Sequence, residues 1–223
     1  MLLTLIGKIK EAADVKTFIF RPQKPIVWEA GQYLIYSLPH DKEDLRGRMR
    51  FFTISKAPFE KNVSITTRIV KNSSTFKKTL DGLKIGEQLN AKGPDGDFII
   101  KNYKKDYVFI AGGIGITPFR SILKQLEYKK KNPNILLFYA CRNDDIVFKK
   151  ELDSLKLKNL KITFFVSKKV GKSDLIKIKG YTKKIYYISG PDPMVDGLEK
   201  ILTSLKVPKK NINLDYFSGY EEI

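Results

Sequence analysis

A glycine-rich turn between an apolar run and an amphipathic helix is the feature that most constrains this chain. The run Tyr107–Ala111 is uniformly apolar, which predicts a buried parallel strand. The turn Gly112-Gly-Ile-Gly115 follows, and we expect Thr117 to cap the next helix and Pro118 to open it. That helix has an apolar face with helical spacing at Phe119, Ile122, Leu123 and Leu126. Because a helix N-terminus carries unpaired N–H groups and a positive dipole end, the turn predicts a site for an anion such as a pyrophosphate.

The spacing of apolar residues changes near residue 102, which predicts two domains, 1–102 and 103–223. The first half predicts a six-stranded antiparallel barrel or sandwich with one helix. Its strands are expected at Leu2–Ile9, Val15–Arg21, Gln32–Leu38, Arg48–Ser55, Val63–Val70 and Gln88–Lys92, and its helix at Thr75–Leu83. The second half alternates strand and helix, which predicts a doubly wound parallel sheet. Its strands are expected at Tyr107–Ala111, Asn134–Ala140, Lys161–Val166, Ile185–Ser189 and Ile212–Tyr216, and its helices at Pro118–Lys131, Val147–Leu155 and Pro193–Leu205.

Composition disfavours several classes of site. Cys141 is the one cysteine and His40 the one histidine, so we expect no internal disulfide and no cysteine-ligated iron–sulfur cluster. Zinc sites and histidine-based catalytic triads are disfavoured for the same reason, and we expect no bound metal. No apolar run reaches the roughly 18 residues that a membrane helix needs. The N-terminus lacks the pattern of a signal peptide, so a cytoplasmic location is the expectation.

The net charge of +18 comes almost entirely from lysine. The lysines are dispersed in short runs such as Lys129–Lys131 and Lys209–Lys210. Without an arginine-rich recognition helix, nucleic acid is a disfavoured partner. We interpret the charge as a solvated, lysine-rich surface, with which an acidic electron-carrier protein is compatible as a partner.

Two weaker signals lie in the first half. The run Arg50–Ser55 offers an arginine, an aromatic ring and a hydroxyl, which could clamp a phosphate, stack on a ring and bond to a ring edge. Alone, it is better interpreted as an amphipathic strand with a salt-bridged arginine. Ser73–Lys77 precedes the short helix and could bind an anion at its N-terminus, or could simply contain an N-cap at Ser74 or Thr75.

Taken together and in order, the motifs resemble those of the ferredoxin–NADP reductase superfamily, and the resemblance covers nearly the whole chain. The motifs are Gly31-Gln-Tyr33, Arg50-Phe-Phe-Thr53, Ser74-Thr-Phe76, Gly93-Pro-Asp-Gly-Asp-Phe98, Gly112-Gly-Ile-Gly-Ile-Thr-Pro118, Ser189-Gly-Pro191 and Tyr216-Phe-Ser-Gly-Tyr220. The pattern is most similar to stand-alone, FAD-dependent reductase modules. It implies a six-stranded FAD-binding barrel joined to a five-stranded, Rossmann-like parallel sheet that binds NADPH or NADH.

The resemblance implies roles for the residues of the FAD site. Arg50 would pair with the FAD pyrophosphate, and Phe52, with Phe51 beside it, would stack on the flavin. Thr53 would bond near flavin N5, the atom that accepts hydride. The other residues implied at this site are Thr66, Thr67, Arg68, Ser74, Thr75 and Phe76. The family usually has tyrosine at position 52, so a phenolic hydrogen bond is lost here. The aromatic residue that covers the flavin is left open among Tyr216, Phe217 and Tyr220.

The dinucleotide site is implied in the same way. Its residues would be Gly112, Gly113, Gly115, Thr117, Gly190, Pro191 and Met194. Ser189, where many members have cysteine, would join Thr53 in the catalytic set. Cys141 and Arg142 end the next strand, near the expected adenosine ribose. Arg142 with Lys168 slightly favours the 2′-phosphate of NADPH, whereas the alternative, NADH, is favoured by two acids that could bind its ribose hydroxyls, Asp144 and Asp145.

The implied reaction passes hydride from NAD(P)H to the flavin, and then electrons to a ferredoxin, a flavodoxin or a haem protein. Pro118 replaces the third glycine of the GxGxxG fingerprint, which argues against an ordinary Rossmann dehydrogenase. Two alternatives stay open. One is a flavin-containing electron-input subunit of a larger redox complex. The other, much less favoured, is a basic nucleic-acid-binding protein.

Overall fold

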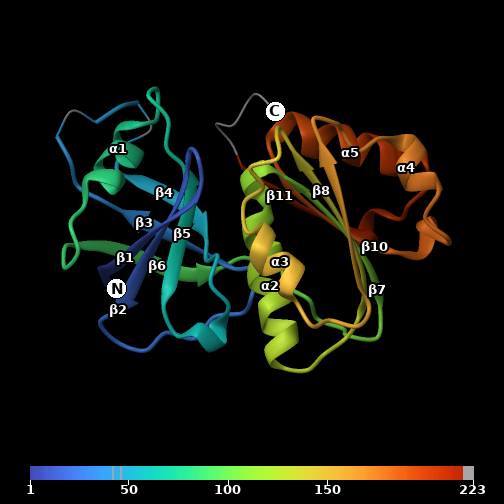
Figure 1. Cartoon of the computed structure of the whole chain (residues 1–223), viewed down its shortest axis with the longest axis horizontal. Coiled ribbons are helices and arrows are strands. Elements are labelled where there is room, and N and C mark those ends of the chain that lie inside the picture. Colours follow the sequence, from blue (N-terminus) through green and yellow to red (C-terminus); the bar gives the residue numbers. More distant parts are fainter. Residues whose placement is uncertain (42, 46, 218–223) are drawn as a thin grey trace.

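Two sheets of different kinds organise the chain, one built from each half of the sequence (Figure 1). The computed structural model describes residues 1–41, 43–45 and 47–217. Among these residues, no helix has the length and apolar character needed to cross a membrane.

The first sheet is an antiparallel barrel of six strands. They are β1 (Leu2–Ala12), β2 (Val15–Pro22), β3 (Tyr33–Ser37), β4 (Met49–Thr53), β5 (Val63–Arg68) and β6 (Gln88–Asp95), in the order β4-β3-β6-β1-β2-β5. The two edge strands meet just beyond β4, where the N–H of Ser55 donates to the carbonyl of Ser64 at 3.2 Å. Helix α1 (Thr75–Gly82) covers the barrel and inserts Phe76 and Leu80 into its core. The predicted barrel is confirmed.

The second sheet is parallel and has five strands. They are β7 (Asp106–Gly112), β8 (Asn134–Cys141), β9 (Leu160–Val166), β10 (Ile185–Gly190) and β11 (Ile212–Tyr216), in the order β11-β10-β7-β8-β9. From β7 the chain adds strands on one side, and it then returns to add β10 and β11 on the other. The direction of winding therefore reverses between β7 and β10. In sheets of this kind, ligands bind beyond the carboxyl ends of the strands at that reversal.

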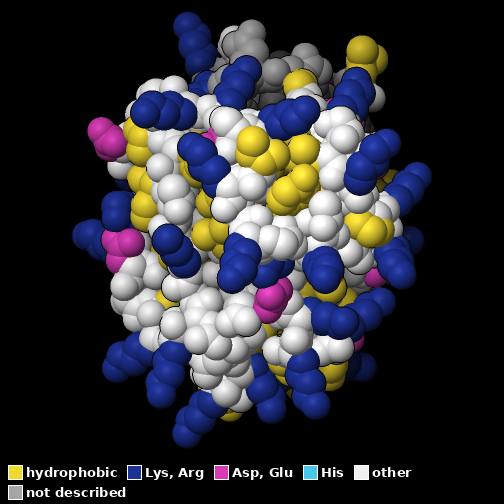
Figure 2. Space-filling model, turned by 90° about the vertical axis from the view of Figure 1, so that its right-hand side faces the viewer, with side chains coloured by type: hydrophobic (Ala, Val, Ile, Leu, Met, Phe, Trp, Pro, Cys, Tyr) yellow, Lys and Arg dark blue, Asp and Glu magenta, His cyan; other side chains and the backbone are white. Residues whose placement is uncertain are grey.

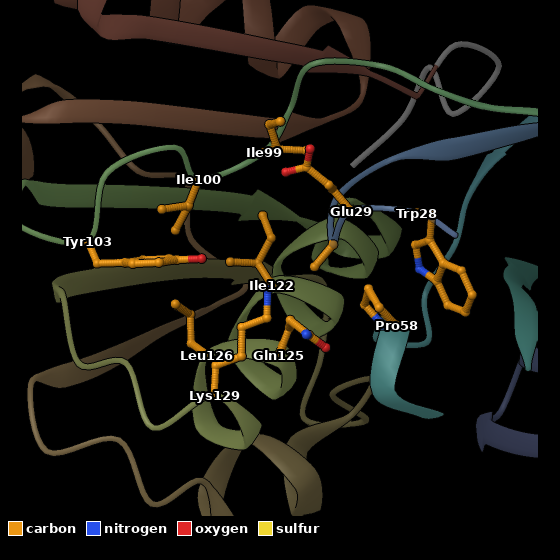
Figure 3. Close-up of a pocket in the computed structure, with 11 residues that line it drawn as sticks. Trp28, Glu29, Pro58, Ile99, Ile100, Tyr103, Ile122, Gln125, Leu126 and Lys129 are labelled. Carbon is orange, nitrogen blue, oxygen red and sulfur yellow. The ribbon is translucent and has the colours of Figure 1, made fainter. Parts of the chain in front are cut away.

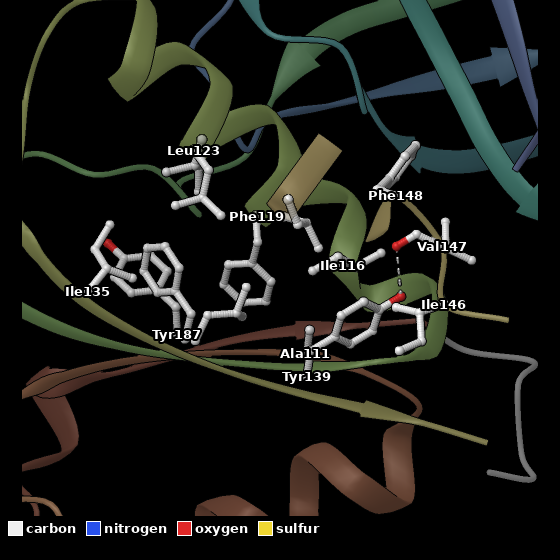
Figure 4. Close-up of a cluster of buried hydrophobic side chains, with 14 of the residues drawn as sticks. Ala111, Ile116, Phe119, Leu123, Ile135, Tyr139, Ile146, Val147, Phe148 and Tyr187 are labelled. Carbon is white, nitrogen blue, oxygen red and sulfur yellow. Dashed lines mark hydrogen bonds between the residues drawn. The ribbon is translucent and has the colours of Figure 1, made fainter. Parts of the chain in front are cut away.

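Helices cover both faces of the parallel sheet. Helices α2 (Ile116–Tyr128) and α3 (Lys149–Ser154) lie on the face toward the barrel, and α4 (Lys172–Ile176) and α5 (Asp192–Ser204) on the outer face (Figure 1). In Figure 4, apolar side chains of α2 point onto the sheet, where Tyr139 donates to the carbonyl of Val147 at 3.5 Å. The same cluster contains Ala12, Val15 and Phe98, so the core of the second half extends into the first.

Short 3₁₀ turns complete the chain: η1 (Pro58–Glu60), η2 (Gly113–Gly115), η3 (Tyr181–Lys183) and η4 (Lys209–Asn211). Figure 2 shows the outer face of the second half, where lysine and arginine side chains are spread over the whole surface around small hydrophobic patches. On this face the positive charge is dispersed, as the sequence predicts, and does not form a single basic stripe.

All the predicted strands and helices exist, and their bounds differ by a few residues from those predicted. One element was missed, and two predictions about the start of α2 were wrong. Helix α4 was not predicted, because five residues rich in lysine give too short a pattern. Thr117 does not cap α2 and Pro118 does not open it. The 3₁₀ turn η2 continues directly into the helix, so Gly115 is the N-cap, Ile116 is the first residue and Pro118 is the third.

Candidate cofactor-binding site between the two halves

The carboxyl ends of β7 and β10 bring two glycine-containing turns into backbone contact. A Cβ at Gly115 would lie 2.1 Å from the carbonyl oxygen of Ser189, and one at Gly190 would lie 3.2 Å from the Cα of Gly112. Gly113 differs, because its φ is +53° and a Cβ there would meet nothing within 4 Å. Gly115 and Gly190 therefore allow the two strand ends to pack, whereas Gly113 leaves its backbone open to a ligand.

The first turn of α2 contains a buried hydroxyl that has no partner among the described residues. Thr117 is 1% exposed, and its Oγ1 makes no hydrogen bond there. The side chains at the helix N-terminus make no cap bond either. Since buried hydroxyls in proteins are nearly always bonded, this end of α2 fits a ligand that supplies acceptors, as phosphate oxygens do.

A cleft of about 250 Å³ opens beside Gly113, between the two halves. Residues from both halves line it, namely Ala12 to Val15, Arg68, Gly113, Tyr139, Cys141 to Asn143 and Asp145 to Val147. The cleft therefore brings Arg68, which was assigned to the FAD site, to the same place as Gly113, Cys141 and Arg142.

Two contacts shape the rim of this cleft. The N–H of Ala13, at the tip of the β1–β2 hairpin, donates to the carboxylate of Asp145 at 2.5 Å. Asp145 is thus engaged by the first half of the chain. On the other side, the Ser167 hydroxyl donates to the carbonyl of Arg142 at 2.8 Å, and Lys168 is the next residue after Ser167 in the chain.

Cys141 is the last residue of β8 and is buried. Its Sγ lies 3.9 Å from the carbonyl oxygen of Tyr139, and burial raises the pKa of the thiol to about 12. A thiol with this pKa stays protonated at neutral pH and is a poor nucleophile. Cys141 therefore contributes its small size and its position on the cleft.

A buried serine and a half-buried aspartate, Ser189 and Asp215, form a pair at the ends of β10 and β11. The two residues are register partners, and the Ser189 hydroxyl donates to the Asp215 carboxylate at 2.9 Å. Burial raises the pKa of Asp215 to about 6, although the hydrogen bond from Ser189 opposes the shift. The sequence analysis missed Asp215. The available signal was a lone carboxylate in the strand Ile212–Tyr216, immediately before the aromatic pair.

The aromatic residues after Asp215 diverge. Tyr216 is 44% exposed, and its hydroxyl donates to Asp196 of α5 at 3.1 Å. The N–H of Phe217 donates to the carbonyl of Gly190 at 2.9 Å, and its side chain packs against the core cluster of the second half. Tyr220 lies outside the described residues. Pro191 and Met194 begin α5 beside Gly190, where a Cβ would lie 2.6 Å from the Met194 methyl group.

A second group of predicted residues gathers at the N-terminus of α1. The guanidinium carbon of Arg50 lies 5.4 Å from the centre of the Phe76 ring, and the centres of the Phe52 and Phe76 rings are 5.9 Å apart. Ser74 is the N-cap, and its hydroxyl accepts from the N–H of Lys77 at 3.4 Å, which confirms the N-cap interpretation. The hydroxyl of Thr75 is 2.9 Å from a ring nitrogen of His40.

A carboxylate occupies the anion position of this second group. One oxygen of Asp44 accepts from Arg50 at 3.2 Å, and the other accepts from the N–H of Thr75 at 3.0 Å. The arginine and the helix N-terminus thus jointly bind an anionic oxygen pair. The same donors fit one phosphate of a dinucleotide, since charge-assisted bonds of this kind suit carboxylate and phosphate alike.

Not every predicted residue joins these groups. Phe51 is 65% exposed and packs edge-on against Tyr33 at 5.6 Å, on the opposite side of β4 from Arg50 and Phe52. Thr66 is buried, and its hydroxyl lies 2.8 Å from that of Thr17 and 2.8 Å from that of Ser55. Two further predicted residues, Thr53 and Thr67, are buried at the end of β4 and within β5.

Two family models match the chain. An oxidoreductase FAD-binding domain matches residues 2–100, and an oxidoreductase NAD-binding domain matches residues 109–200. Among curated relatives, the glycine betaine monooxygenase reductase subunit of Chromohalobacter salexigens is 30% identical over 152 residues. That match covers 66% of this chain and only 40% of the relative, so the chain spans less than half of the relative's length.

Solved structures share the fold over almost the whole chain. A cytochrome P450 reductase from Amycolatopsis matches with a TM-score of 0.84 at 19% identity, covering 97% of this chain and 70% of that one. The ferredoxin–NADP⁺ reductase of Plasmodium falciparum matches with a TM-score of 0.82 at 21% identity, covering 97% and 95%. At these identities the likeness establishes the fold, in which an antiparallel barrel is joined to a parallel sheet.

Proposed function

The chain belongs to the ferredoxin–NADP reductase-like oxidoreductases that join an FAD-binding domain to an NAD-binding domain, and we propose that it reduces its FAD with NADPH or NADH and delivers electrons to a one-electron acceptor protein. The observation that carries this proposal is the convergence of both cofactor regions on one cleft. Arg68 of the first half, and Gly113 and Arg142 of the second, line the same cavity of about 250 Å³. We place the division between the two domains after residue 102.

The residues of the first domain would hold FAD. Arg50 and the N–H groups at the start of α1 would bind its pyrophosphate, since they already bind a carboxylate, and Phe52 would stack on the ring system. Thr53 would lie at the reactive edge of the ring. Bound FAD supplies the hydride acceptor and the carrier of single electrons. The protein supplies alignment and excludes water.

The second domain would hold the dinucleotide. Gly113 and the orphan hydroxyl of Thr117 would face its phosphates, with Gly190 beside the nicotinamide. Ser189 is 0% exposed and its hydroxyl donates to Asp215, so Ser189 would act by fixing Asp215 and the end of β10 beside the nicotinamide. That support would orient the ring for hydride transfer.

The coenzyme is proposed to be NADPH. Arg142 lies on the cleft, and its carbonyl is bonded by Ser167, the residue before Lys168, whereas Asp145 is engaged by Ala13 and is less available for ribose hydroxyls. We expect anaerobic mixing of the FAD-loaded protein with NADPH to bleach the flavin faster than mixing with NADH at equal concentration. Stopped-flow absorbance measures both rates. Failure of the chain to bind FAD, or of either coenzyme to reduce it, would overturn the proposed function.

The electron acceptor is proposed to be an acidic redox protein such as a ferredoxin or a flavodoxin, because the surface is strongly basic. A second candidate role is electron input within a larger complex. It is favoured by the relative from Chromohalobacter salexigens, which is named as a reductase subunit. Co-purification of a stable partner with the tagged chain would favour this second role, and efficient turnover of the isolated chain with a free carrier would favour the first.

Replacing Asp44 by asparagine is expected to tighten FAD binding by about tenfold, or roughly 1.4 kcal/mol. Its carboxylate competes with the pyrophosphate for Arg50 and for the N–H of Thr75. The matched control is Glu43→Gln. This substitution also removes a negative charge from the loop, but the partner of Glu43 is Arg48 and not Arg50. Titration of FAD by fluorescence quenching measures the dissociation constants. Equal effects of the two substitutions would contradict a direct competition.

A further inference from the structure

Helix α2 contacts the first domain through side chains that meet successive backbone groups of one segment. Arg120 Nη1 donates to the carbonyl of Ser55 at 3.1 Å, and the Ser121 hydroxyl donates to the carbonyl of Lys56 at 2.9 Å. Further along the helix, the side chain of Gln125 accepts from the N–H of Phe59 at 3.3 Å. The register between α2 and residues 55 to 59 is therefore specified by directional bonds.

Arg120 is fixed from both domains. On its own side it donates to Glu151 of α3 at 2.7 Å, and its guanidinium carbon lies 5.5 Å from the centre of the Phe148 ring. We call the contact between α2 and residues 55 to 60 of the first domain the seam. Across it, the same guanidinium bonds Glu60 through both terminal nitrogens. Burial opposes ionisation of Glu60, yet Arg120 outweighs it and holds the pKa of that carboxyl below its ordinary value. The pair therefore stays charged at neutral pH.

Other directional bonds join the domains elsewhere, from Ala13 to Asp145 and from Tyr187 to Ile99, but the contacts beside the α2 bonds are largely apolar. Figure 3 shows Pro58 of the first domain beside Gln125 of α2, at a small cavity of about 90 Å³ that Trp28 and Ile122 also line. Apolar contacts are non-directional, so a seam made of them alone would tolerate small sliding movements. The charged, forked bonds of Arg120 do not tolerate them.

The bonded atoms are close in sequence to both cofactor regions. Arg120 follows Thr117 by one helical turn, and Thr117 lies in the first turn of the helix that we assign to the dinucleotide phosphates. Ser55 follows Thr53 by two residues, and Thr53 ends the strand that we assign to the flavin. The guanidinium of Arg120 thus connects β4, which we assign to the flavin, with α2, which we assign to the dinucleotide phosphates, over short stretches of chain.

We propose that Arg120 and Ser121 are positioning residues that set the separation between the flavin site and the nicotinamide site. They touch neither cofactor region directly and act through Ser55 and Lys56 on one side and through α2 on the other. This proposal rests on the proposed function, because it assumes that hydride crosses between these two sites. It also makes a statement about the cofactor-free chain, namely that the seam loosens when the bonds are removed.

The test compares Arg120→Gln with Lys124→Gln. Lys124 lies one turn further along α2, and its ammonium bonds Glu127 of the same helix at 2.9 Å. Lys124→Gln therefore removes a positive charge from α2 without removing a bond across the seam. Trp28 is the only tryptophan of the chain, is 6% exposed, and packs in the barrel core while lining the small cavity at the seam, so its emission should respond to seam opening without any cofactor. The second readout is the rate of flavin reduction at saturating NADPH, and the third is the dissociation constant of FAD.

For Arg120→Gln we expect a red shift of Trp28 emission and a rate of flavin reduction lower by roughly 10- to 100-fold, with unchanged FAD affinity. Lys124→Gln should leave all three readouts unchanged, and Arg120→Lys should restore part of the rate. Ser121→Ala removes one seam bond with little risk to folding, and we expect a smaller loss in the same direction. It decides the matter if Arg120→Gln does not fold.

A folded Arg120→Gln or Ser121→Ala variant with the wild-type emission and the wild-type reduction rate would overturn the proposal. Equal losses in Lys124→Gln would also overturn it. A wild-type chain that binds FAD but is not reduced by either coenzyme would instead refute the proposed function. In that case the Trp28 emission still tests whether Arg120 holds the seam.

Discussion

Asp215→Asn is expected to stabilise the cofactor-free chain at neutral pH by about 2 to 3 kcal/mol. Asp215 is half-buried, and the desolvation of its carboxylate raises the pKa from the ordinary 3.8 to about 6. A rise of that size corresponds to roughly 3 kcal/mol of penalty on the charged form in the folded state. The asparagine oxygen accepts the same bond from Ser189, whereas its amide group must find a new partner, which accounts for the lower end of the range.

The advantage of Asp215→Asn should depend on pH in a defined direction. Between pH 4 and pH 6 the folded chain holds a proton on Asp215 that the unfolded chain releases, so wild-type stability from this group falls as the pH rises. The advantage of the variant is therefore full above about pH 6 and absent below about pH 4. Urea unfolding at several pH values measures it. Asp196→Asn, on the exposed surface of α5, is the control, and a pH-independent difference would contradict the assignment.

Gly115→Ala is expected to destabilise the chain by roughly 3 kcal/mol or more, because the new methyl group has no room. Its Cβ would lie 2.1 Å from the Ser189 oxygen and 2.7 Å from the Gly190 Cα, and both are backbone atoms between packed strands. The matched control is Gly113→Ala in the same turn, where a Cβ meets nothing within 4 Å. Its φ of +53° should cost only about 1 kcal/mol.

Denaturant unfolding of the two alanine variants, together with their soluble yields, separates the two roles of the glycine-rich turn. Gly113→Ala should remain folded and should bind the dinucleotide more weakly, since the methyl group enters the open side of the turn. Equal stability losses at the two positions would contradict the assignment of Gly115 to packing and of Gly113 to the ligand.

The fold could be predicted because its signals are local. The apolar run Tyr107–Ala111, the change of spacing near residue 102 and the N-cap at Ser74 each depend on residues that are neighbours in sequence. The start of α2 was missed because the 3₁₀ turn at Gly113–Gly115 is decided by packing of Gly115 on Ser189, far away in the chain. Local sequence contains no trace of that contact.

The candidate site was predicted less completely, and for the same physical reason. Gly113 was placed by its motif, and Cys141 and Arg142 by their position at a strand end, and the three residues do share a cleft. Asp215 and Asp44 were missed, because their importance comes from partners that the fold brings to them from other strands and loops. Phe51 illustrates the opposite error, since its place in a motif does not say which side of β4 its ring occupies.

The packing around Phe98 has a consequence for exchanging domains between related reductases. Phe98 belongs to the core of the second domain, with its ring centre 5.6 Å from that of Phe119 and 4.9 Å from that of Tyr187, and Tyr187 donates to the carbonyl of Ile99 at 2.7 Å. The segment that joins the two domains is therefore part of the core of the second domain and is not merely a linker. A chimera joined before residue 98 would keep this contact only if it took residues 98 to 100 from the same parent as the parallel sheet.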